Sequence, residues 1–128
     1  MNNAILEHVN VTVSDPEKSA DMLCDLFNWQ IRWSGDSING GKTIHVGSEG
    51  SYVALSPPKG VTTDTGSSYV SLGGLTHIAV VVKELDKVEA RVKAAGFTPE
   101  NHDNYEPGRR FYFHDSDGVE YEVVSYED

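Results

Sequence analysis

Two histidines occupy the same place in two similar apolar runs of the 128-residue chain. His8 stands near the start of residues 7–13, and His77 stands near the start of residues 76–82. An imidazole can bind a divalent ion or carry a proton near neutral pH. A single strand histidine is more often a hydrogen-bonded core residue, and duplication of a structural residue would also produce such a pair. By themselves, the two histidines leave a ligand role and a structural role equally open.

A carboxylate near the C-terminus favours the ligand role. Strand alternation in residues 119–125 places Glu120, Glu122 and Val124 on one face, and Tyr121 and Val123 on the other. A carboxylate in an otherwise apolar strand is costly to bury unless a cation or a hydrogen-bond donor compensates it. Glu122 together with two inward histidines therefore indicates a metal ion or a proton network. Two histidines and one carboxylate, with positions left for substrate, are typical of non-haem iron(II) and are usable by manganese, nickel or zinc.

These residues lie in a duplicated pattern. Each histidine run is followed by a polar break and a helical stretch, and residues 43–55 then align with residues 111–123. Within that alignment a Ser-acid-Gly turn falls on a Ser-acid-Gly turn. Self-similarity at a fixed period predicts two copies of a strand-helix-three-strand module, each too small to bury its own sheet. We therefore expect an α+β fold in which the second sheet face of each module is covered by the other.

Breaker residues set the expected boundaries. The first module is predicted over residues 1–56, a Pro-, Gly- and hydroxyl-rich linker over 57–73, and the second module over 74–128. Ser14 and Glu17 have the spacing of a capping box for a helix that ends near Asn28. The second helix is predicted from Glu84 to Ala95, and residues 101–108 are predicted as a loop between strands.

Three further polar residues are predicted on the face that carries the candidate ligands. Arg110 and Tyr112 alternate with the apolar Phe111 and Phe113, and Asn10 alternates with the valines that follow His8. We expect Arg110 to bind an anionic group of a substrate, Tyr112 to act as a catalytic hydrogen-bond donor, and Asn10 to orient the ligand. Each of these residues could equally be a solvated residue at the rim.

The remaining histidines and the cysteine are expected to be structural. His45 aligns with Phe113 and is therefore placed on the helix side, His102 lies in the predicted loop, and His114 lies at a turn edge. Cys24, in the middle of the first helix, is expected to be a small buried hydrophobe.

Charge and segment analysis narrow the functional classes. Ten basic and twenty acidic residues give a formal net charge of −10, which repels nucleic-acid phosphates and anionic lipid headgroups. The N-terminus carries neither the basic start nor the apolar length of a signal sequence, and no later run is long enough to span a bilayer. A cytoplasmic protein that binds a small molecule is the resulting expectation.

The paired modules, a histidine in the first strand of each, and the ending 115–122 with glutamate four residues after Gly118 resemble the vicinal oxygen chelate superfamily. That superfamily includes glyoxalase I, methylmalonyl-CoA epimerase, extradiol dioxygenases, fosfomycin-resistance enzymes and bleomycin-resistance binding proteins. The resemblance implies curved mixed sheets that pair into an open, incompletely closed barrel-like cavity. It also implies one divalent ion (Fe, Mn, Ni, Co or Zn) bound by His8, His77 and Glu122, with Glu122 also catalytic.

Ala54 departs from part of this superfamily. It occupies the first-module counterpart of Glu122, where glyoxalase I and the epimerase have a glutamate or glutamine ligand. The resemblance thus implies a metal-dependent enzyme of the glyoxalase and dioxygenase type, with isomerase, lyase, dioxygenase or thiol-transfer chemistry left open. The alternative is a non-catalytic antibiotic-binding protein of the bleomycin-resistance type. A homodimer is expected, because modules can pair within one chain or swap between two copies.

Overall fold

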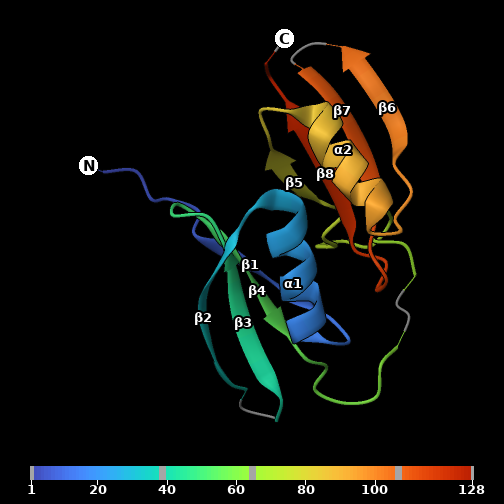
Figure 1. Cartoon of the computed structure of the whole chain (residues 1–128). Helices are drawn as coiled ribbons and strands as arrows, with labels where there is room; N and C mark the ends of the chain where they lie inside the picture. Colours follow the sequence, from blue (N-terminus) through green and yellow to red (C-terminus); the bar gives the residue numbers. More distant parts are fainter. Residues whose placement is uncertain (1, 38–39, 64–65, 106–107, 128) are drawn as a thin grey trace. The chain divides into compact units, whose positions relative to one another are not determined.

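Each half of the chain forms one strand, one helix and three further strands (Figure 1). The structure is a computed structural model that describes residues 2–37, 40–63, 66–105 and 108–127. It divides into two compact units, Met1–Thr62 (unit 1) and Thr63–Asp128 (unit 2), whose boundary falls inside the expected linker. Asp64 and Thr65 of that linker, and Glu106 and Pro107 of the predicted loop, lie outside the described residues.

Unit 1 is a four-stranded mixed sheet with one helix. Its elements are β1 (His8–Thr12), α1 (Pro16–Phe27), β2 (Gln30–Asp36), β3 (Lys42–Gly47) and β4 (Tyr52–Ser56). The strand order is β1-β4-β3-β2, in which β1 runs parallel to β4 and the other pairs are antiparallel. The two outer strands of the sheet, β1 and β2, are therefore adjacent in sequence, and α1 connects them.

Unit 2 repeats this topology. Its elements are β5 (Ile78–Val81), α2 (Leu85–Ala94), β6 (Glu100–Tyr105), β7 (Gly108–His114) and β8 (Glu120–Ser125). The order β5-β8-β7-β6 again has a parallel first pair and antiparallel remaining pairs. The structure confirms the predicted α+β class and the duplicated module, and neither four-stranded sheet closes into a barrel.

The first helix begins one residue later than the capping-box prediction. Asp15, not Ser14, is the N-cap, and its side chain accepts the backbone N–H of Lys18 at 3.2 Å. The cause is Pro16, which holds the residue before it in extended conformation and starts the helix with a fixed φ angle. At the other end Asn28 adopts the left-handed conformation, with a φ of 56°. Its backbone N–H donates a hydrogen bond to the Cys24 carbonyl.

One apolar layer in each unit joins the helix to its sheet. In unit 1 the buried residues of α1 pack against β3 and β4, and in unit 2 the buried residues of α2 pack against β8. Side chains of this size contribute about 1.5–3 kcal/mol each when fully buried, so these layers stabilise the attachment of each helix to one face of its sheet. The layer in unit 1 includes Leu23, Leu26, Ile44, Val46 and Leu55, and that in unit 2 includes Val88, Val92, Phe111, Phe113 and Tyr121.

The predicted loop over residues 101–108 is wrong in its first part, because β6 extends from Glu100 to Tyr105. This strand is the edge of the sheet and pairs only with β7, so it needs no apolar face. Its register shifts between Glu100 and Asp103, where Asn101 has a φ of 51°. A polar edge strand with such an irregularity has no apolar alternation for sequence analysis to detect.

The duplicated hairpins differ by one residue in their turns. Gly47 pairs with Tyr52 across the turn of unit 1, whereas His114 pairs with Glu120 across the longer turn of unit 2. Consequently, residues before the turn and residues after the turn of unit 1 cannot both be aligned with unit 2 by the same shift in residue number.

This difference corrects the placement of His45. The strands after the turns correspond as predicted, with Ala54 matching Glu122, but His45 pairs with Ala54 as Tyr112 pairs with Glu122. His45 is therefore the counterpart of Tyr112 rather than of Phe113. It lies on the sheet face away from the helix, with the candidate ligand His8, and the expectation of a helix-side residue is wrong.

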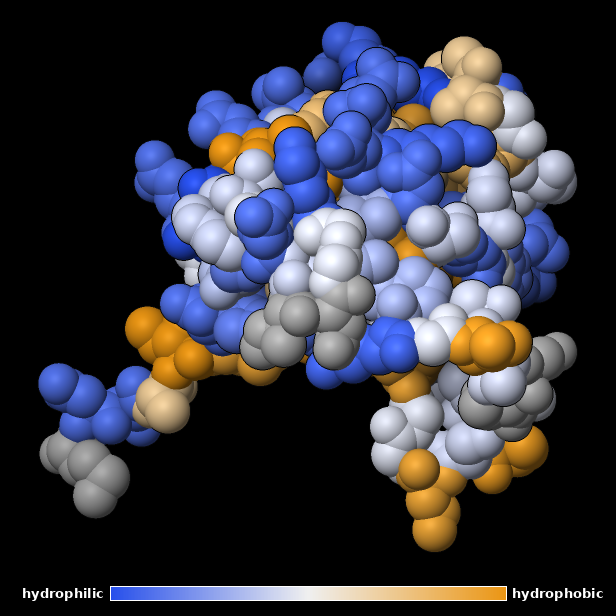
Figure 2. All heavy atoms as spheres, turned by 90° about the horizontal axis from the view of Figure 1, so that it is seen from below, coloured by the Kyte–Doolittle hydropathy of each residue, from blue (hydrophilic) through white to orange (hydrophobic). Residues whose placement is uncertain are grey.

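Exposed residues of both polar and apolar kinds lie at the surface (Figure 2). Figure 2 shows one face on which hydrophilic residues prevail and hydrophobic residues form small separate patches. The most exposed large apolar side chains belong to the N-terminal segment and to the connection between the units, and include Ile5, Leu6, Val61, Val70 and Leu72. Among the described residues, the helices are too short and too polar for any of them to traverse a lipid bilayer.

Candidate functional site

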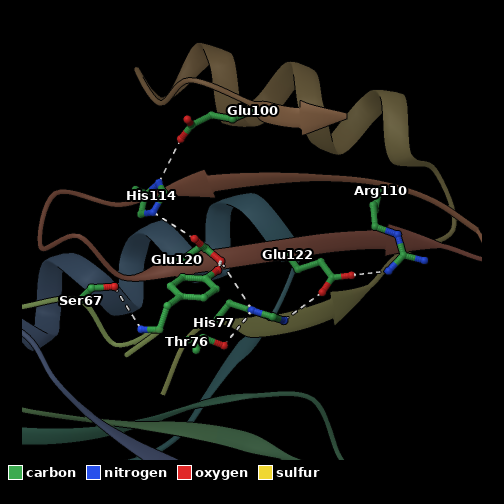
Figure 3. A network of polar contacts seen from close by, with 9 residues as sticks. Ser67, Thr76, His77, Glu100, Arg110, His114, Glu120 and Glu122 are labelled. Carbon is green, nitrogen blue, oxygen red and sulfur yellow. Dashed lines mark hydrogen bonds and ion pairs between the residues drawn. The ribbon is translucent and has the colours of Figure 1, made fainter. Parts of the chain in front are cut away.

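The sheet face of unit 2 that lies away from α2 carries a chain of charged groups. His77 Nε2 lies 3.1 Å from Glu122 Oε1, and the Arg110 guanidinium donates to Glu122 Oε2 at 2.8 Å (Figure 3). The side chains of Glu122 and Arg110 are only 10% and 12% exposed. A carboxylate shielded to this degree needs compensation, and here the guanidinium and the imidazole provide it. The structure thus brings together three of the predicted site residues within one unit.

A second carboxylate lies behind His77. Glu120 Oε2 is 3.6 Å from His77 Nδ1, and Glu120 Oε1 is 3.2 Å from His114 Nε2. His114 Nδ1 in turn contacts Glu100 Oε1 at 3.0 Å. His77 therefore sits between two carboxylates, as Figure 3 shows, and His114, which was expected to be only structural, belongs to the same network.

Two tyrosines border this network. The Tyr112 ring meets the His77 ring edge-on, with centroids 5.7 Å apart and an interplanar angle of 89°. Tyr69, from the connection between the units, donates its hydroxyl to Glu120 Oε2. That hydrogen bond, with partial desolvation, raises the pKa of Tyr69 to about 12, so the hydroxyl remains a donor at neutral pH. Tyr112 is thus close to His77, and Tyr69 is a participant that the sequence did not reveal.

The corresponding face of unit 1 holds His8 in a different setting. His8 Nδ1 donates to Glu7 Oε1 at 2.9 Å, and Tyr52 donates its hydroxyl to the same oxygen at 3.1 Å. These two hydrogen bonds, that of His8 first, lower the pKa of Glu7. In both units, therefore, the candidate histidine directs Nδ1 toward a carboxylate and leaves Nε2 for another partner.

Aromatic rings cover much of this face of unit 1. The Tyr52 ring stacks against His8 at 4.7 Å and against His45 at 4.6 Å, and Trp33 lies 4.9 Å from His45. The Arg32 guanidinium lies over the Tyr52 ring at 4.6 Å. Desolvation, followed by the nearby charge of His8, lowers the pKa of His45. This arrangement provides a half-buried aromatic surface with a cation at its edge.

The other predicted positions differ in their surroundings. Asn10 is exposed and pairs in register with Ala54, which is 1% exposed and has the sheet position that Glu122 has in unit 2. His102 contacts Glu89 at 3.0 Å in another part of unit 2, consistent with a structural role. Sequence reasoning missed Glu7, Tyr52, Tyr69 and Glu120, although Glu120 shares the face of Glu122 and Glu7 precedes His8.

His77 and Glu122 are the residues of this face that could hold a divalent ion together. Ligand atoms bound at 2.0–2.2 Å lie about 3–3.5 Å from each other, and the 3.1 Å between His77 Nε2 and Glu122 Oε1 falls in that range. Ligating histidines characteristically direct their second nitrogen to a carboxylate or hydroxyl, as His8 and His77 do here. Among the described residues, no cluster of three or more histidine, cysteine, aspartate or glutamate side chains is arranged so that it could hold a metal ion.

The fold also occurs in proteins of different activities. A glyoxylase/bleomycin resistance protein/dioxygenase domain from Frankia sp. EAN1pec is 23% identical, with a TM-score of 0.80, over 97% of this chain and 93% of that one. FosX of Listeria monocytogenes, a fosfomycin resistance protein solved with Mn(II) and sulfate, is 22% identical, with a TM-score of 0.73, over 97% and 93%. TnmS3 of Streptomyces sp. CB03234, an antibiotic binding protein, is 20% identical, with a TM-score of 0.73, over 98% of both chains.

The sequence itself gives the family. No curated protein sequence matches the chain significantly. The family model for the Glyoxalase/Bleomycin resistance protein/Dioxygenase superfamily matches residues 5–123, nearly the whole chain. With a duplicated strand-helix-three-strand module and a matched histidine in each copy, the chain belongs to this superfamily.

Proposed function

We propose that this protein is a divalent-metal-dependent enzyme of the glyoxalase and dioxygenase type. The observation that carries the proposal is the setting of His77, whose Nδ1 lies 3.6 Å from Glu120 and whose Nε2 lies 3.1 Å from Glu122, while His8 likewise directs Nδ1 to the carboxylate of Glu7. His77 and Glu122 supply two adjacent donor atoms, and His8 from unit 1 of this chain or of a second copy supplies the third. A homodimer is expected because each module leaves one sheet face open, and this face can be covered by the other module of the same chain or of a second copy.

Other residues of the chain would orient the metal ligands and the substrate. A bound divalent ion would hold vicinal oxygens of a small substrate and stabilise negative charge that develops on them. Arg110 keeps one Glu122 oxygen occupied and so orients the other toward His77. Tyr112, whose ring contacts His77, would donate a hydrogen bond to a substrate, and Asn10 would orient the ligand from unit 1.

Metal titration tests the proposal directly. Protein purified without added metal should bind about one equivalent of Mn²⁺, Fe²⁺, Ni²⁺, Co²⁺ or Zn²⁺ in isothermal titration calorimetry, and its melting temperature should rise with the metal concentration. His77→Ala should abolish most of this binding. His102→Ala removes a histidine that contacts a carboxylate elsewhere in unit 2 and serves as the matched control. A wild-type protein that gains no thermal stability from any of these ions would refute the metal site.

A second function is favoured by one observation, the stacked rings of unit 1. A surface made by His8, His45, Tyr52 and Trp33 suits a planar ligand, as a binding protein without catalysis would require. Tyr52→Leu separates the functions, because it should weaken capture of a planar ligand in fluorescence titrations while His77→Ala leaves such capture nearly unchanged. Loss of metal binding on His77→Ala, with no binding of planar ligands by the wild type, would favour the enzyme.

A further inference from the structure

We propose that Glu120 is a positioning residue, whose carboxylate, itself held by Tyr69 and His114, fixes the ring of His77 so that Nε2 faces Glu122. The inference deepens the proposed function and rests on it, because His77 and Glu122 are the candidate metal ligands. It assigns a role to a carboxylate that lies beside the candidate site without belonging to its ligand set.

Contacts from three parts of unit 2 meet at Glu120. Its side chain is only 12% exposed, and one oxygen accepts the Tyr69 hydroxyl and lies 3.6 Å from His77 Nδ1. The other oxygen lies 3.2 Å from His114 Nε2. Tyr69 lies in the segment that precedes β5, His77 is the residue directly before β5, and His114 ends β7. The carboxylate is therefore contacted from several directions (Figure 3).

Fixing one nitrogen of an imidazole fixes the other, because the ring is rigid. His77 Nδ1 is contacted both by Glu120 and by Thr76 Oγ1, the latter at 3.2 Å. These contacts leave Nε2 directed at Glu122, 3.1 Å away. A histidine whose ring is already oriented loses less rotational freedom when it binds an ion.

Local turns place Tyr69 against β8. The Tyr69 N–H donates to Ser67 Oγ at 3.2 Å, and the Ser67 carbonyl accepts from Val70 N–H at 3.3 Å and from Ser71 Oγ at 2.9 Å. This part of the connection is therefore ordered by its own hydrogen bonds, and it delivers one hydroxyl to Glu120. The serine-rich composition, which indicated only a linker, provides these turns.

The equivalent contact in unit 1 is less shielded. His8 receives its carboxylate from its sequence neighbour Glu7, whose side chain is 64% exposed, whereas that of Glu120 is 12% exposed. Because solvent screens an exposed contact strongly, Glu120 should orient its histidine more firmly than Glu7 does. The effect of removing the charge should therefore be larger in unit 2.

Calorimetric titration with Mn²⁺ and Zn²⁺ compares three variants with wild type. Glu120→Gln keeps the size and removes the charge, and it should weaken binding by about 10-fold or more, as loss of an outer partner of a ligating histidine does. Tyr69→Phe removes only the hydroxyl and should weaken binding by about threefold. Glu89→Gln alters another carboxylate that contacts a histidine, with a side chain that is 17% exposed, and should bind metal as wild type does.

A second readout needs no metal. Nitrogen-15 spectra of the histidine rings in the metal-free protein, with His77 identified by His77→Ala, should show His77 resonances that shift in Glu120→Gln and remain in place in Glu89→Gln. If the wild type binds no ion, the proposed function fails, and these spectra alone decide the role of Glu120. If the wild type binds metal but Glu120→Gln shows neither weaker binding nor shifted resonances, the positioning role is overturned and the metal site stands. Should Glu120→Gln fail to fold, Tyr69→Phe replaces it, because Tyr69 is 62% exposed and its loss is tolerable.

Discussion

The two units share one topology and present different chemistry on the same sheet face. In unit 1 the face is built from stacked rings, with Tyr52 in contact with both His8 and His45. In unit 2 the corresponding face is built from charges, with Glu122 between His77 and Arg110. The strand order is alike in both, with β1 beside β4 and β5 beside β8, so different side chains occupy equivalent strands.

The two copies of the module therefore carry different side chains around a histidine that they share. Each copy retains a histidine whose Nδ1 faces a carboxylate, which conserves a common donor geometry. Around that histidine, unit 1 presents aromatic rings, while unit 2 presents shielded charges. We expect substitutions in unit 2 to affect stability and metal binding more than the equivalent substitutions in unit 1.

The largest effect is expected for Glu122→Leu. This change leaves the Arg110 guanidinium, 12% exposed, without its carboxylate, and breaking a shielded pair of this kind typically costs about 3 kcal/mol or more. Urea unfolding in the presence of EDTA measures the loss. The equivalent test in unit 1 is Glu7→Gln, which alters an exposed contact and should leave the unfolding midpoint almost unchanged.

The double variant Arg110→Met/Glu122→Leu controls for the loss of volume and polarity. Because it removes both charges, it should be more stable than Glu122→Leu alone. Equal destabilisation by the single and double variants would show that the unpaired Arg110 charge does not account for the effect. The shielded ion pair would then not distinguish the stability of unit 2 from that of unit 1.

An intermediate effect is expected when unit 1 is made more like unit 2. Ala54 has the sheet position of Glu122 and is 1% exposed, so Ala54→Glu should cost more than about 1 kcal/mol without metal. If His8, His77 and Glu122 bind one ion, the new carboxylate adds an anionic ligand and should tighten binding. Titration of the melting temperature with metal checks this, with Ala54→Gln as a neutral control. A variant that remains destabilised at saturating metal would count against the shared site.

The repeat in the sequence was sufficient to predict most of the fold. Matched histidine runs and matched helix ends predicted the module and the order of its elements along the chain, because these signals arise from burial and helix termination. The wrong predictions concern residues for which the sequence carries no such signal. The edge strand β6 is polar because only one side of it is paired, and His45 was misplaced because the second hairpin turn has one more residue.

The candidate site was predictable only along single strands. Alternation placed Arg110, Tyr112 and Glu122 on one face of the sheet correctly, since period-two geometry is local. Contacts between residues of different elements leave no pattern in the local sequence, so they could not be predicted. Tyr69 lies in an aperiodic segment, and the link from Tyr69 through Glu120 to His77 depends on how that segment folds back onto β8.

The smallest expected effect concerns the acid response of His45. Its desolvation, together with the nearby charge of His8, lowers its pKa below the ordinary value of 6.5 that it regains on unfolding. Since the folded state favours the neutral ring, this contribution to stability is complete above that value and is lost as the pH falls through the folded-state pKa. His45→Phe keeps an aromatic ring against Tyr52 but cannot be protonated. Thermal unfolding in EDTA from about pH 7.5 to about pH 5 should therefore show a slightly steeper fall in melting temperature for wild type than for His45→Phe. Parallel profiles would show that His45 is not desolvated by the aromatic face, and the comparison between an aromatic unit 1 and a charged unit 2 would lose its support at that residue.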